Sequence, residues 1–76
     1  MTPPTTVNLL PHQQRVVQEK AELDVKINAL RSFMQTVTFQ SLPLKEQGLR
    51  HEQFIVMNRY SDILASLINL FEKVSP

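Results

Sequence analysis

Apolar side chains recur at steps of three and four residues along two long stretches of the chain. In the first stretch the recurring positions are Val16, Leu23, Ile27, Leu30, Met34 and Val37. Lys20 fills the one polar slot in this row. The spacing puts the row on one face of a helix and does not match the alternation of a strand. It predicts a helix over residues 9–39, with Pro11 in the first turn.

The second stretch carries two neighbouring apolar rows. One row, at heptad spacing, consists of Leu49, Gln53, Val56, Tyr60, Ile63, Leu67, Leu70 and Val74. The other consists of Phe54, Met57, Leu64, Ile68 and Phe71. Ser61 is the one gap in this second row. The pattern predicts a helix over residues 44–73 after a break at 40–43, with Ser41 as its N-cap and Pro43 in its first turn.

Two long helices joined by so short a break are expected to pair antiparallel, so the predicted fold is all-α, a two-helix hairpin over residues 9–73 that follows a tail at 1–8. One partner helix covers only about one of the two rows. We expect the other row to remain as an apolar strip and to form the interface of a homo-oligomeric helical bundle. The residues assigned to this interface are Phe54, Met57, Leu64, Ile68 and Phe71. A different protein partner, or the tail folding back, are the alternatives.

Composition narrows the function classes. A chain of 76 residues usually needs a disulfide, a metal or oligomerisation to stabilise its core, and this one has no cysteine. Its two histidines match no metal-binding spacing, and neither a nucleophile elbow nor a glycine-rich phosphate loop is present. We therefore expect neither a catalytic site nor a metal or cofactor. A formal net charge of +1 fits poorly with duplex nucleic-acid binding.

The sequence also gives no reason to expect a membrane partner. No apolar run approaches the roughly 18 residues that span a bilayer. The first residues lack the charged and apolar regions of a signal peptide. A cytoplasmic protein is the expectation.

Candidate ligand contacts lie at the predicted start of the first helix. His12 and Arg15 belong to a polar run in its first turns. A helix N-terminus favours anions, Arg15 offers a phosphate fork, and the His12 ring can stack on a base. The simpler interpretation is a solvated first turn.

Two further groups can likewise be interpreted either as ligand contacts or as ordinary structural side chains. Tyr60 occupies an apolar slot although its hydroxyl needs a polar partner, and Arg59 lies beside it; the pair would suit a base and a phosphate, or simply a core aromatic and a solvated cation. Lys20 lies on the apolar face, where it either snorkels to solvent or lines an anion site. Lys26 is expected to pair with Glu22, four residues earlier on the same helix.

The chain resembles a known group of phage proteins in several of these segments. They are the run Pro11–Val17, the run Glu19–Leu23, the break at Leu42–Pro43, and residues from Gln53 through Met57–Ser61. In length, order and helix spacing, the sequence is similar to small helical-hairpin proteins of tailed bacteriophages, the anti-CBASS sponge family. The resemblance spans residues 11–71. The tail departs from the family pattern because it has no aromatic residue.

The resemblance implies a function that composition alone does not. Such proteins form compact homo-oligomers, hexameric in that family, which bind cyclic di- or trinucleotides without cleaving them and so keep a bacterial immune effector inactive in the cytoplasm of the infected host. The positions here that suit aromatic stacking or phosphate contact are His12, Arg15, Lys26, Arg59 and Tyr60. The alternative is a structural or partner-binding hairpin, used in phage assembly or to inhibit a host protein.

Overall fold

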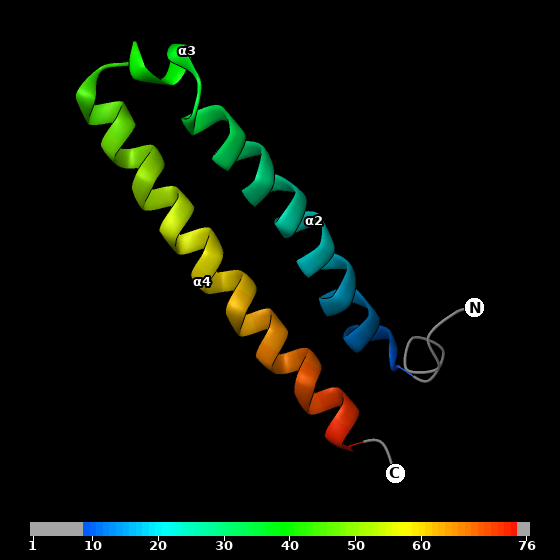
Figure 1. Ribbon diagram of the computed structural model, residues 1–76. Coiled ribbons are helices and arrows are strands. Elements are labelled where there is room, and N and C mark those ends of the chain that lie inside the picture. The colour runs from blue at the N-terminus through cyan, green and yellow to red at the C-terminus, as the bar shows by residue number, and fades with distance from the viewer. Residues whose placement is uncertain (1–8, 75–76) are drawn as a thin grey trace.

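The computed structural model describes residues 9–74, with side chains through residue 71. Three helices occupy this part of the chain: α2 (Pro11–Met34), α3 (Val37–Gln40) and α4 (Leu44–Val74). The long helices α2 and α4 run side by side in opposite directions, and α3 closes one end (Figure 1). The prediction of an all-α antiparallel hairpin is confirmed for the described residues, and the expected tail at 1–8 lies outside them.

Helix α2 begins with local side-chain bonds. Pro11 is its first residue, where the missing N–H costs nothing. The side chain of Gln13 accepts a hydrogen bond from the Leu10 N–H at 2.9 Å, and the Gln14 amide donates to the Leu9 carbonyl at 2.8 Å. Glutamine side chains therefore fix the entry to this helix.

The connection between the long helices is longer than expected. Helix α2 ends at Met34 instead of near residue 39, and Thr36 caps the short helix α3 by accepting from the Phe39 N–H at 3.2 Å. Phe39 is buried, with its ring edge-on to Phe33 and to His51 at 5.8 Å between centroids in each case. Burying this ring turns the chain away from α2, and Val37, which was predicted to extend the apolar face, is exposed.

The start of α4 also differs from the expectation. Ser41 ends α3 and donates to the Thr38 carbonyl at 2.7 Å, so it is not the N-cap of α4. Pro43 directly precedes the helix. The side-chain amide of Gln47 instead ties down the turn by donating to the carbonyls of Gln40 and Leu42, at 3.1 and 2.8 Å.

The seam between α2 and α4 contains most of the small core. Ile27 and Leu30 of α2 are buried, as predicted, and Leu64 of α4 is buried with them. Ser61, on the same face of α4, hydrogen-bonds to α2. Phe54 lies under the Arg31 guanidinium of α2, 5.5 Å from its ring centroid. The row that faces α2 is therefore the one interrupted by Ser61.

This corrects the assignment of the two rows of α4. The residues predicted to face other copies were Phe54, Met57, Leu64, Ile68 and Phe71. In the single chain each of them is buried or half-buried, on the helix face that packs on α2. The spacing showed two apolar rows but carried no information on which row the first helix would cover.

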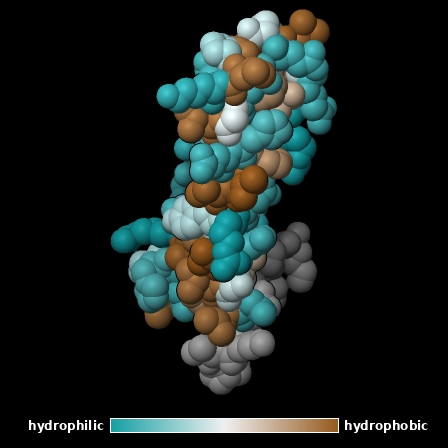
Figure 2. Space-filling view, turned by 90° about the vertical axis from the view of Figure 1, so that its left-hand side faces the viewer, coloured by the Kyte–Doolittle hydropathy of each residue, from teal (hydrophilic) through white to brown (hydrophobic). Residues whose placement is uncertain are grey.

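The opposite row of α4, here called the outer row, is exposed instead. Its exposed members are Leu49, Val56, Tyr60, Ile63, Leu67 and Leu70. Figure 2, which shows the left-hand side of Figure 1 where α4 lies, has apolar patches along this face separated by polar side chains. A row this long is the kind of surface that soluble proteins use for association.

Candidate functional site

A surface hollow of about 280 Å³ lies beside the seam. It is lined by Glu19, Glu22, Leu23 and Lys26 of α2 and by Tyr60 of α4. Residues 19, 22, 23 and 26 share one side of α2 because helical residues three, four and seven apart are neighbours. The antiparallel pairing then brings Tyr60 from the far end of the sequence to the same place.

Tyr60 joins the two helices at this hollow. Its hydroxyl donates a hydrogen bond to the Glu19 carboxylate. That bond, with a smaller contribution from desolvation, raises the pKa of Tyr60 above its ordinary value of 10.0, because the phenolate could not donate and would face a negative charge. Since the side chain is 40% exposed, one part of the ring remains accessible from solvent. The polar partner that Tyr60 was expected to need is thus Glu19.

Lys26 lines the hollow without the ion pair expected for it. Among the described residues, ion pairs within 4.0 Å join Lys20 to Asp24 and Arg50 to Glu46. Glu22, the expected partner of Lys26, instead accepts from the Gln18 amide at 3.1 Å. Lys26 is therefore a cation lining the same hollow as Tyr60, and no carboxylate among the described side chains lies within 4.0 Å of its ammonium.

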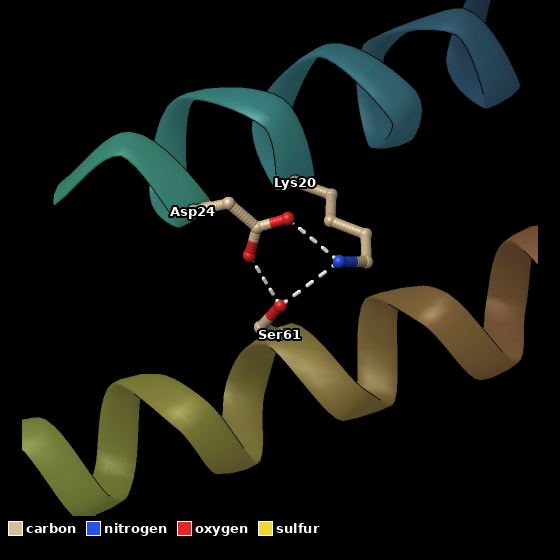
Figure 3. Close-up of polar contacts among 3 residues, drawn as sticks. All are labelled: Lys20, Asp24 and Ser61. Carbon is tan, nitrogen blue, oxygen red and sulfur yellow. Dashed lines mark hydrogen bonds and ion pairs between the residues drawn. The ribbon is translucent and has the colours of Figure 1, made fainter. Parts of the chain in front are cut away.

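A second polar group lies between the helices (Figure 3), where Lys20 follows Glu19 and Ser61 follows Tyr60 in the sequence. Lys20 donates to the Asp24 carboxylate at 2.7 Å and to the Ser61 hydroxyl at 3.1 Å, and Ser61 donates to Asp24 at 2.6 Å. The bonds from Lys20 and then Ser61 lower the pKa of Asp24, since both stabilise the carboxylate. We call these three residues the seam cluster. The Lys20 ammonium donates to Asp24 and Ser61. It therefore neither extends past the seam to solvent nor lines an open anion site, the two alternatives considered from the sequence.

The structure brings together two of the five predicted ligand contacts. Lys26 and Tyr60 line one hollow, whereas His12, Arg15 and Arg59 are exposed residues that do not line it. The sequence reasoning missed Glu19, Glu22 and Leu23. Glu19 lies seven residues before Lys26, a separation that places both on one helix face, so the signal for Glu19 was present in the spacing.

Neither a group of metal ligands nor a membrane-spanning helix is found in the described part of the chain. Within residues 9–74, no group of three or more histidine, cysteine or acidic side chains is placed to hold a metal ion. In that same part of the chain, none of the helices has the length and apolar character needed to cross a bilayer. The polar groups that line the hollow, beside the apolar Leu23, are two carboxylates, one ammonium and one phenol.

Known proteins similar to this chain were found at the level of sequence. A family model described as Sequestin matches residues 10–66. An uncharacterized 7.5 kDa protein from the denB–rIIB intergenic region of Enterobacteria phage T4 is 38% identical over 64 residues, which cover 84% of this chain and all of the phage protein. No solved structure matches.

These matches confirm the resemblance to small phage proteins of the sponge type. The family's name points to sequestration of a molecule by binding and not to catalysis. The helical hairpin, the matched residues and the full-length similarity to the phage T4 protein together show that this chain belongs to the Sequestin family.

Proposed function

We propose that the protein is a non-enzymatic sponge that sequesters cyclic oligonucleotide second messengers of bacterial anti-phage immunity. The observation that carries the proposal is the pairing, at one hollow, of an accessible Tyr60 ring with a Lys26 ammonium that forms no ion pair with Glu22. A cyclic oligonucleotide presents flat bases and phosphates, for which a ring and a cation are the complementary groups. Membership of a family named for sequestration supports the same role.

The charge balance of the hollow means that an anionic ligand would need additional cations from outside it. One hollow holds the carboxylates of Glu19 and Glu22 against the single ammonium of Lys26. A cyclic dinucleotide carries two negative charges, so one hollow alone offers too little positive charge. A second hollow would add its own Glu19 and Glu22 along with its Lys26, so the exposed cations Arg15 or Arg59 of neighbouring copies would have to supply the remainder.

The outer row gives a means of assembly. Tyr60 belongs both to this row and to the hollow, so packing of outer rows between copies would bring two hollows close together. We propose a homo-oligomer built in this way, a hexamer by analogy with the phage sponge proteins, that acts in the cytoplasm of the infected host. The site at each junction would be repeated by the symmetry of the particle.

The proposal is tested by titrating the purified protein with cyclic di- and trinucleotides in a calorimeter and measuring the oligomeric mass by sedimentation. We expect at least one ligand to bind and to be recovered intact after the complex is denatured. Lys26→Ala should weaken binding by about tenfold or more, the loss typical of one charge-assisted contact. Lys45→Ala, the same change at an exposed position away from the hollow, is the control. If none of the cyclic nucleotides binds, the proposal is wrong. If a linearised nucleotide is recovered, the protein is a hydrolase and not a sponge.

The exposed outer row also supports a second function, that of a hairpin that binds a different protein in phage assembly or host inhibition. The row is apolar over much of α4 and lies on a face that α2 does not cover. This function predicts a single chain in solution that keeps the row open and ignores cyclic nucleotides. The same sedimentation and calorimetry experiments therefore distinguish the two.

A further inference from the structure

The two polar slots in the apolar seam meet each other. Each facing row has one polar interruption, Lys20 on α2 and Ser61 on α4. The fold places the Lys20 ammonium 3.1 Å from the Ser61 hydroxyl, and Asp24 bonds to both (Figure 3). A polar group on one helix thus faces its partner on the other, although 41 residues separate Lys20 from Ser61.

The two bonds to Ser61 exist in one register of the two helices, whereas the Lys20–Asp24 ion pair lies within α2. Among the described residues, no buried side-chain nitrogen or oxygen lacks a hydrogen-bond partner. A slip of one helical turn, about 5.4 Å, would set Lys20 and Asp24 against Met57 or Leu64. Their ion pair within α2 would persist, but the Ser61 hydroxyl, whose residue is only 7% exposed, would lose both of its bonds to α2, and an unpaired buried hydroxyl is costly. A single polar position in an apolar helix interface is known to fix register in this manner.

The same register brings Tyr60 to the hollow. Tyr60 precedes Ser61 on α4, and its partner Glu19 precedes Lys20 on α2. The two interhelical links therefore lie side by side, one inside the seam and one at its edge. We propose that the seam cluster sets the register of α2 against α4 and thereby positions Tyr60 at the hollow. Its relevance to ligand binding rests on the proposed function, whereas the register is measured without a ligand.

Tyr60 provides a direct readout. It is the one tyrosine in a chain without tryptophan, so the ultraviolet absorbance of phenolate reports on Tyr60 alone. In the native register the bond to Glu19 keeps its titration midpoint above the ordinary value. Loss of the register would separate Tyr60 from Glu19 and return the midpoint toward that value. A change in general stability would not shift the midpoint while the hairpin remains folded.

The first test is Lys20→Leu combined with Ser61→Leu, which makes both rows continuously apolar. We expect helix content by circular dichroism to be retained, because the Asp24 carboxylate that loses both partners is 41% exposed and remains open to water. The Tyr60 midpoint should nevertheless fall. Ser32→Leu, at an exposed position of α2, should leave the midpoint raised. An unchanged midpoint in the fully helical double variant would overturn the inference.

The second test exchanges the two residues. Ser61→Lys alone places two ammonium groups in the seam and should lower the Tyr60 midpoint or unfold the hairpin. Adding Lys20→Ser returns one ammonium to the seam, now from α4, within reach of Asp24, and the raised midpoint should be restored. If the exchange gives no rescue, the cluster does not set the register.

These outcomes are separate from those of the proposed function. A wild-type protein that ignores every cyclic nucleotide, while the cluster variants lose the raised midpoint, would remove the sponge and keep the register device. If the protein binds a cyclic nucleotide while every folded cluster variant keeps the raised midpoint, the sponge function stands and the inference about the register is wrong.

Discussion

The two apolar rows of α4 look alike in sequence and have opposite environments. Leu64 in the seam is 3% exposed, whereas Ile63, its chain neighbour in the outer row, is 42% exposed. The rows differ in where their polar groups point: Ser61 finds Lys20 and Asp24 inside the seam, and Tyr60 reaches Glu19 at its edge. The comparison shows that the row packed within the chain is the one whose polar residue bonds inside the seam, whereas the polar residue of the other row bonds only at the edge.

The largest expected effect comes from truncating the seam. Leu64→Ala should lower the free energy of unfolding by about 2–5 kcal/mol, because it removes a buried side chain and leaves a cavity in a small core. Leu67→Ala, the same change in the outer row, should cost well under that amount in the single chain, since the side chain is 38% exposed. Chemical denaturation followed by circular dichroism measures both. Equal losses would mean that the two rows are equally buried in solution.

Changes in the outer row should act on association. Ile63→Ser with Leu67→Ser removes apolar area from a face that α2 does not cover, so helix content should stay near that of the wild type. Self-association should weaken by about a hundredfold, or about 2.7 kcal/mol. Sedimentation over a range of concentrations gives this value. A particle of unchanged mass would show that copies meet elsewhere.

The sequence predicted the hairpin well because it is a property of spacing. Ile27 and Leu30 were placed on the buried face of α2 by their step of three residues, and they are buried. The turn was predicted less well, since the burial of Phe39 depends on rings contributed by Phe33 and His51 from both long helices. Contacts between distant segments leave no periodic trace in either segment.

The candidate site was predicted only in part for the same reason. Lys26 and Tyr60 were selected for their chemistry, and the fold brings them to one hollow. Glu19 was missed because its role comes from Tyr60, 41 residues away. The polar slots at Lys20 and Ser61 were visible in the sequence, but their meeting depends on the register of the hairpin, which the spacing alone leaves open.

A substitution at Gly48 should stabilise α4 as a whole and so should not distinguish its two apolar rows. It lies inside this helix, its φ is not positive, and an added Cβ would meet no atom within 4 Å. Gly48→Ala should therefore stabilise the helix by about 1 kcal/mol through the lower conformational entropy of the unfolded chain. Thermal unfolding measures the gain, and sedimentation should show an unchanged mass. A loss of stability would indicate that a neighbouring copy approaches the backbone here.

The smallest effects concern the two interhelical links, which should break at opposite ends of the pH scale. The pKa of Asp24 is lowered, so its contribution to stability is present above its ordinary value of 3.8 and is lost as the pH falls through its folded value. The pKa of Tyr60 is raised, so its contribution is present below 10.0 and is lost as the pH rises through its folded value.

Matched variants separate the two links. Asp24→Asn should flatten the acid limb of the stability profile and leave the alkaline limb, and Tyr60→Phe should do the converse. Unfolding measured across the pH range gives both limbs from one set of samples. Since both side chains are partly exposed and solvent screens their interactions, the differences should be small beside the loss from Leu64→Ala. If Asp24→Asn changed the alkaline limb as well, the link in the seam and the link at its edge would be a single coupled unit.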